Sequence, residues 1–324
     1  MYAFEVLLLL TCVIGVLALK IAGVGITWWT FRFTVQDGIV PFLIIFFTGM
    51  ILQLIHHWIQ GQKLRSYLDS IRKPSWMLLW VRLWIACLFL SYSHMWLKLA
   101  IPLINRRLWD FQFWNLDIWL HAGISPSRFV MELFRGTVLV PALDTWYSWW
   151  LTISLYSLGF FCAAGNEVLR RQFAFSQIMI WTLGVWIYIG WPSLGPCYAY
   201  SEEWANLKGK MPHAENTQSA LMRNYWKVVD SWRTGRIKAP FNPSYGIAAM
   251  PSLHVGIMWL LFLWSRKHAR LLALFYLLGT VLTFLGSILT GWHYAVDGYA
   301  GILIAQLCYW AATLTERQPP PQAS

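Results

Sequence analysis

The sequence predicts an all-α, polytopic transmembrane helical bundle of about eight spans. Hydrophobic residues make up 58% of the 324 residues and charged residues only 12%, about half the charged fraction of an ordinary soluble domain. The chain also contains 23 tryptophans, and amphipathic rings are enriched where helices meet a membrane surface. The five cysteines show no paired spacing, so they imply neither a disulfide nor a zinc framework. This composition excludes a cytosolic enzyme, a secreted disulfide scaffold and a disordered chain.

Eight apolar stretches approach the roughly 20 residues that a helix needs to cross a bilayer. In chain order these stretches are 5–31, 38–60, 77–104, 137–162, 173–192, 249–265, 271–290 and 294–315. The N-terminal stretch has neither a basic leader nor a small-residue cleavage site, which indicates an uncleaved anchor. We expect residues 1–76 to form two additional spans with a cytoplasmic loop, residues 77–315 a six-span core, and residues 316–324 a short cytoplasmic tail.

Three basic residues fall within the predicted spans. Arg82 and Lys98 lie near the ends of the stretch 77–104, where long basic side chains usually reach the interface. Lys20 lies deeper in its span, at a depth where a charge is expensive and by default marks a functional position.

Basic residues in short loops predict the orientation, because they favour the cytoplasmic side. The loops 61–76, 163–172 and 266–270 are rich in lysine and arginine and fall on one face. Both termini are then cytoplasmic, and the long segments 105–136 and 193–248 face a periplasm or a lumen. We therefore expect a multi-pass protein of a bacterial inner membrane or, in a eukaryote, of a Golgi-type membrane. The net charge of +11 fits anionic lipid headgroups, and no nucleic-acid partner is expected, because basic and aromatic residues are not interleaved in a soluble module.

Two acidic residues stand near the predicted outer ends of spans. Asp117 lies on an amphipathic segment that we expect to form an interfacial helix. Asp144 lies near the outer end of the fourth span, where it either lines a cavity or caps a helix.

A histidine and an aspartate mark the outer end of the last span. His293 and Asp297 are four residues apart, which places them on one face of a helix. A carboxylate one turn away can accept the proton of one imidazole nitrogen and leave the lone pair of the other nitrogen facing outward. The pair is either a nucleophile with its orienting group or a helix-start histidine that a local acid satisfies.

A second cluster, Pro251-Ser252-Leu253-His254, lies at the outer end of the stretch 249–265. Pro251 suits the first turn of a helix, and the N–H groups that follow it, with the Ser252 hydroxyl, predict an anion site. His254 would then lie beside a bound phosphate. The alternative is a proline-started transmembrane helix with an interfacial histidine.

Together the two clusters resemble the type 2 phosphatidic acid phosphatase superfamily, which is built on a P-S-x-H motif and a later H-x-x-x-D motif. Pro251, Ser252 and His254 match the first motif, and His293 and Asp297 match the second. The stretches A-M-P-S-L-H and H-Y-x-x-D are most similar to the inositol phosphorylceramide synthase branch. The resemblance covers roughly the last six spans, from about residue 77. It implies that His293 attacks phosphorus, Asp297 orients it and His254 protonates the departing oxygen, without a metal or another cofactor.

The resemblance implies an integral-membrane phosphotransferase or phosphatase that acts on a lipid-linked phosphate through a phosphohistidine on the extracytoplasmic face. Its partners would be a lipid-phosphate donor and an alcohol headgroup as acceptor. Two other classes stay open. One is a metal-dependent membrane enzyme in which His254, His293 and Asp297 form a two-histidine, one-carboxylate site. The other is a transporter in which Lys20 and Asp297 are buried relay charges.

The sequence departs from the family pattern where phosphate is bound. The family places Ser-Arg before the second histidine, but those positions here are Gly286 and Ser287, and the early K-x6-R-P motif is not intact. We expect Arg236 and Lys238, the nearest basic residues to the P-S-L-H cluster in sequence, to bind phosphate with Ser252. The other basic candidates in the same loop are Arg223, Lys227 and Arg233. A phosphodiester carries less negative charge than a monoester and needs fewer cationic donors, so the missing arginine favours transfer over hydrolysis.

Overall fold

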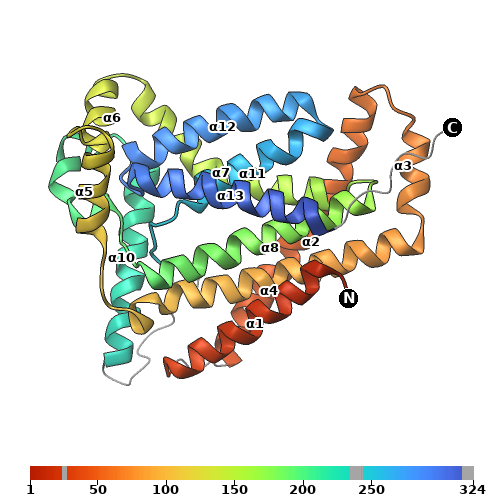
Figure 1. The fold of residues 1–324 in the computed structure, drawn as a ribbon, viewed down its shortest axis with the longest axis horizontal. Helices are drawn as coiled ribbons and strands as arrows, with labels where there is room; N and C mark the ends of the chain where they lie inside the picture. The colour runs from red at the N-terminus through yellow and green to blue at the C-terminus, as the bar shows by residue number, and fades with distance from the viewer. Residues whose placement is uncertain (24–27, 234–241, 243, 316–324) are drawn as a thin grey trace.

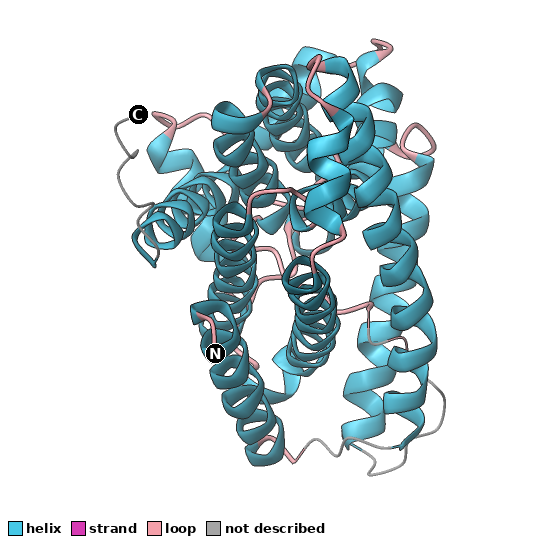
Figure 2. Cartoon of the chain, turned by 90° about the vertical axis from the view of Figure 1, so that its right-hand side faces the viewer, coloured by secondary structure: helices cyan, strands magenta, loops and turns pink. Residues whose placement is uncertain are grey.

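The computed structural model describes residues 1–23, 28–233, 242 and 244–315. Over this part of the chain it contains helices and no strand, which confirms the predicted all-α class. Long helices run side by side through the body of the molecule, as Figures 1 and 2 show. They are α1 (Ala3–Ile21), α2 (Trp28–Ile59), α4 (Pro74–Ile104), α7 (Leu139–Cys162), α8 (Glu167–Gly190), α11 (Leu253–His268), α12 (Arg270–Leu289) and α13 (Ala295–Thr315).

A long helix occupies each of the eight stretches that were predicted to cross the membrane. Five helical segments are long and apolar enough to do so by length and composition alone: α1, residues 38–59 of α2, α4, α8 and α12. The chain is therefore a multi-pass membrane protein, and the count of eight spans stays a prediction.

Shorter helices gather at the two ends of the bundle (Figure 1). At one end lies α3 (Leu64–Ile71). At the other end lie α5 (Asp110–Leu120), α6 (Pro126–Phe134) and α10 (Pro212–Arg233). The chain between α8 and α10 also forms two short elements, α9 (Pro196–Ala199) and η1 (Ser201–Leu207).

Contacts join the three basic loops at the α3 end. The Tyr67 hydroxyl donates to the Ala163 carbonyl at 3.0 Å, which connects the loop 61–76 to the loop after α7. The His56 ring lies beside the backbone of His268, the last residue of α11. These loops therefore lie at one end of the bundle, opposite α5, α6 and α10.

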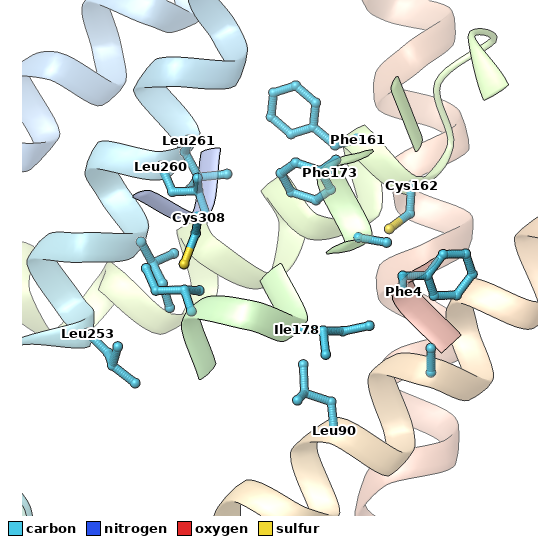
Figure 3. Packing of buried hydrophobic residues seen from close by; sticks show 14 of the residues in the cluster. Phe4, Leu90, Phe161, Cys162, Phe173, Ile178, Leu253, Leu260, Leu261 and Cys308 are labelled. Atoms are coloured by element: carbon cyan, nitrogen blue, oxygen red, sulfur yellow. The ribbon is translucent and has the colours of Figure 1, made fainter. Parts of the chain in front are cut away.

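A continuous apolar core joins the helices, and Figure 3 shows part of it. Phe161 of α7 stacks on Phe173 of α8 with ring centroids 4.6 Å apart, and Leu261 and Cys308 are fully buried between α11 and α13. Helix α1 packs on α4 and α8, and α2 packs on α7 and α4. The first two long helices are thus part of the same bundle.

The structure shows the surroundings of the three basic residues within the predicted spans. Helix α1 ends at Ile21 instead of near residue 31, so Lys20 is an exposed residue of its last turn, where the helix dipole favours a cation. Arg82 forms an ion pair with Glu5 in the first turn of α1. The Lys98 ammonium lies over the ring of the buried Tyr188, 5.7 Å from its centroid.

Candidate active site

Two glycines allow α11 and α13 to touch along their backbones. A Cβ atom at Gly301 would lie 2.2 Å from the Ser252 carbonyl oxygen, and one at Gly256 would lie 2.8 Å from the Gly301 carbonyl oxygen. No other residue type fits at this distance, since real Cβ atoms do not approach backbone so closely. The contact brings the start of α11, with His254, against the start of α13.

The three predicted catalytic side chains meet at this contact and form a chain of hydrogen bonds. His254 Nδ1 lies 3.1 Å from His293 Nε2, and His293 Nδ1 lies 3.3 Å from Asp297 Oδ2. His293 is 1% exposed and Asp297 is fully buried. With a proton on Nδ1 facing the carboxylate, the Nε2 lone pair of His293 points at His254, the polarity that a nucleophile with an orienting acid requires.

His293 does not lie on a shared helix face with Asp297, as the four-residue spacing had suggested. Helix α13 begins at Ala295, and His293 belongs to the turn that follows α12. His293 and Asp297 still meet because Asp297 Oδ2 also accepts from the Tyr294 N–H at 2.9 Å, which folds the turn back onto the first residues of α13. Burial lowers the pKa of His293, so its imidazole is neutral and its lone pair is available.

The P-S-L-H cluster adopts a different local structure from the one expected. Helix α11 begins at Leu253, Ser252 is its N-cap with Oγ accepting from the Val255 N–H at 3.4 Å, and Pro251 precedes the cap instead of lying in the first turn. The Ser252 N–H is not free, because it donates to the Asp297 carbonyl at 2.8 Å. The role of Ser252 in binding phosphate stays a prediction.

Two buried carboxylates of α5 clamp the site from outside the bundle. Asp117 accepts from the Ala295 and Val296 N–H groups at 2.7 and 2.8 Å, and so caps α13. Asp110 accepts from the Gly195 N–H at 2.9 Å and from the Tyr294 hydroxyl at 2.8 Å. Sequence reasoning missed Asp110, although its seven-residue spacing from Asp117 places both on one helix face.

The remaining outer acid, Asp144, is a helix cap instead of a cavity residue. Its carboxylate accepts from the His213 and Ala214 N–H groups at 3.0 and 2.8 Å, at the start of α10.

Aromatic side chains of α7 enclose His254, which nothing in the sequence had indicated. The Tyr147 ring stacks on the His254 ring with centroids 5.0 Å apart. Trp150 lies closer, at 4.2 Å, and its Nε1–H donates to the His254 carbonyl at 2.8 Å. Among 23 tryptophans and 14 tyrosines, these two had no distinguishing pattern.

The basic residues that were predicted to bind phosphate lie either outside the described part of the chain or exposed on α10. Arg236 and Lys238 lie outside the part of the chain that the structure describes. The other candidates of that loop lie exposed on α10; they are Arg223, Lys227 and Arg233.

The geometry does not favour the two alternative classes. Both ring nitrogens of His293 face hydrogen-bonding partners, so the three side chains form a line instead of converging on one ion. Among the described residues, no group of three or more His, Cys, Asp or Glu side chains is placed to hold a metal. Lys20 is exposed at the end of α1, so it is no buried relay partner for Asp297.

Comparison with known families gives one match. The model of the PAP2 superfamily matches residues 112–311, from α5 to α13. The chain belongs to the PAP2 superfamily. Comparisons with curated proteins and with solved structures give no match. PAP2 superfamily members are helical membrane phosphatases and phosphotransferases, so this multi-pass chain is a membrane enzyme of the phosphatase type. Helices α1, α2 and α4 lie outside the matched residues.

Proposed function

We propose that this PAP2 enzyme acts on a lipid-linked phosphate through a phosphohistidine at His293. The 3.1 Å contact between His254 Nδ1 and His293 Nε2 supports this proposal, because it points the lone pair of one ring at the proton donor of the other. A phosphoryl group that enters between the rings meets a nucleophile and a general acid at once.

The first step breaks the bond between phosphorus and the departing oxygen. His293 Nε2 attacks phosphorus, and His254 in its imidazolium form gives its proton to the leaving alkoxide, so a neutral alcohol departs. The developing positive charge on His293 is stabilised by Asp297, which holds the Nδ1 proton. In the second step an acceptor hydroxyl attacks phosphorus, its proton passes to neutral His254, and the P–N electron pair returns to Nε2.

The acceptor is an alcohol headgroup in this proposal, as in the inositol phosphorylceramide synthase branch, and the reaction is transfer instead of hydrolysis. Ser287, at the position of the family arginine, contributes no charge. Its carbonyl accepts from the His293 N–H at 3.2 Å, and its hydroxyl donates to the Phe284 carbonyl at 2.8 Å. A phosphodiester donor needs fewer cationic groups than a monoester.

A cavity with basic side chains in its lining lies near the site. It has a volume of about 410 Å³, lies between the outer ends of α4 and α10, and is lined by Arg106, Arg233 and Ser193 among others. Ser193 also accepts from the Ala249 N–H at 3.0 Å and the Met250 N–H at 3.1 Å, so it holds the segment that leads to Ser252. The cavity therefore adjoins the P-S-L-H cluster.

The site is proposed to face the periplasm or a lumen, because it lies at the end of the bundle opposite the basic loops.

The deciding experiment supplies purified protein with labelled phospholipid donors, with and without alcohol acceptors, and follows inorganic phosphate and new lipid product together. A new phosphodiester lipid that disappears in His293→Ala is the expected result. Rapid release of phosphate from a monoester, with no exchange product under any acceptor, would instead identify a phosphatase. Turnover that persists after exhaustive chelation would separate this chemistry from a metal-dependent enzyme.

A further inference from the structure

The proposed reaction needs positive charge at the phosphate, and the described positions considered so far place no cation against the histidine pair. The family arginine is replaced by Ser287, and the N–H group of Ser252 is already engaged. A phosphate oxygen in a water-poor site requires cationic or hydroxyl donors. Side chains from other helices that reach the histidine pair are therefore the place to look.

Lys98 of α4 reaches the site from a helix outside the matched residues 112–311. Its ammonium lies 5.7 Å from the ring centroid of Tyr188, a buried residue of α8, and the Tyr188 side chain lies beside the backbone of Leu253 at the start of α11. A Cβ atom at Gly246 would lie 2.9 Å from Lys98 Cγ, so the Lys98 side chain also packs against the segment that leads to Ser252.

Lys98 forms no ion pair with another described residue. None of the ion pairs between described residues includes Lys98; those pairs use Arg72, Arg82, Arg128, Arg135, Arg171 and His293. A half-buried cation without a carboxylate is costly to maintain, and an anionic substrate would supply the missing charge.

Tyr147 of α7 contributes a hydroxyl near His254. Its ring stacks on the His254 ring, and its hydroxyl is buried without a hydrogen-bond partner among the described residues. A Cβ atom at Gly286 would lie 3.5 Å from the Tyr147 Cβ, so Tyr147 packs beside the positions where the family carries Ser-Arg. A buried hydroxyl without a partner is destabilising, and a phosphate oxygen would supply the missing partner.

We propose that Lys98 and Tyr147 form the phosphate-binding site of this enzyme, with the Lys98 ammonium in place of the family arginine and the Tyr147 hydroxyl as a second donor. This inference rests on the proposed function. The ligand is the phosphoryl group of the donor, and inorganic phosphate shares its oxygens.

The test measures the affinity of the detergent-purified full chain for inorganic phosphate by titration calorimetry, at an ionic strength held constant with chloride. Lys98→Met should weaken phosphate binding about 10- to 100-fold, the effect of a lost charge-assisted hydrogen bond, and Lys98→Arg should restore most of it. Tyr147→Phe should weaken binding about 2- to 10-fold without lowering the thermal midpoint of the free protein, because the hydroxyl has no partner to lose.

Two variants serve as matched controls. Tyr276→Phe removes a buried hydroxyl that is bonded to Ser157 Oγ at 2.6 Å, so it should lower the thermal midpoint and leave phosphate affinity unchanged. Lys20→Met removes an exposed lysine at the end of α1 and should change neither.

The outcomes separate this inference from the proposed function. Wild-type phosphate affinity in Lys98→Met, or no phosphate binding by the wild-type protein, would overturn the inference, whatever the lipid assays show. Binding that depends on Lys98 in a protein that turns over no lipid phosphate would keep the phosphate site and refute the proposed reaction. His293→Ala should still bind phosphate while it loses turnover, which distinguishes binding from chemistry.

Discussion

The Asp117 carboxylate accepts a hydrogen bond from the backbone N–H of Val296 at 2.8 Å, directly before the orienting acid Asp297. A residue of the outer helix α5 therefore fixes the first turn of α13. Because Asp297 and His293 both depend on that turn, the geometry of the nucleophile is set partly from outside the helices that carry it.

Asp117 makes stability depend on pH in a defined direction. Burial raises the pKa of Asp117 to about 6, above its ordinary unfolded value of about 3.9. The folded state thus holds this proton more tightly, and the stabilisation that it provides below pH 4 is lost as the pH rises to about 6. A shift of this size corresponds to up to about 3 kcal/mol.

Asp117→Asn should remove this slope between pH 4 and pH 6. Thermal midpoints of the wild type and the variant, measured across this range in one detergent, provide the comparison. Asp69→Asn, an exposed residue of α3, should keep the wild-type slope. An unchanged slope in Asp117→Asn would show that this carboxyl does not titrate there.

The catalytic roles predict graded losses of turnover. His293→Ala should abolish turnover, because no other described side chain is placed to attack phosphorus. His254→Ala should lower it ~10²–10⁴-fold, the usual contribution of a general acid. Asp297→Asn should leave a trace, because it removes orientation and not the attacking atom. Turnover of a labelled lipid donor measures all three.

His121→Ala is the matched control for these variants. His121 lies at the outer end of α5, and its Nε2 contacts the Tyr299 hydroxyl at 2.9 Å, away from the histidine pair. It should retain turnover. A fully active His293→Ala would end the phosphohistidine mechanism.

Because the backbones of α11 and α13 touch, we expect that one added methyl group at their contact moves the two histidines apart. In Gly301→Ala the new Cβ would lie 2.2 Å from the Ser252 carbonyl oxygen, so the helices must move apart. Overpacking of this kind costs about 1–3 kcal/mol, and we expect a lower thermal midpoint together with a lower kcat.

Gly190→Ala is the matched substitution, because nothing lies within 4 Å of its added Cβ. It should behave as the wild type in both measurements. Wild-type kcat in Gly301→Ala would mean that close approach of the two helices is not required for catalysis.

The orientation predicts which surface an impermeant thiol reagent reaches in intact cells. Asn216→Cys, on exposed α10, should be labelled from outside. Ser66→Cys, exposed on α3 at the other end of the bundle, should be labelled only after the membrane is broken. Labelling of the parent protein gives the background from its own cysteines, and the reverse pattern would place catalysis in the cytoplasm.

The membrane helices were predictable because apolar length is a strong, local signal. The residues at which these helices begin and end were less predictable. Helix α11 starts at Leu253, four residues after the apolar stretch begins, because Ser252 caps the helix and Ser193 holds Ala249 and Met250 in the non-helical segment before it. These partners are remote in sequence and leave no periodic pattern.

The same distinction applies to the site. His254, His293 and Asp297 were found because their motifs are short and each lies within one local stretch. Lys98, Asp110 and Tyr147 come from three other helices and act through contacts that only the folded chain creates. Their residue types are also ordinary in a membrane protein, so single-sequence reasoning read Lys98 as an interfacial lysine.

The contact between His254 and His293 has a consequence for the idle enzyme. With no donor present, the two rings form a hydrogen bond with each other. The Nε2 lone pair of His293 that would attack phosphorus is then occupied by His254, the residue that later supplies the proton. A phosphate compound must wedge the rings apart, which forfeits a hydrogen bond worth about 0.5–1.5 kcal/mol. The substrate itself therefore frees the lone pair of the nucleophile. Ligands that make too few other contacts to separate the two rings do not bind productively.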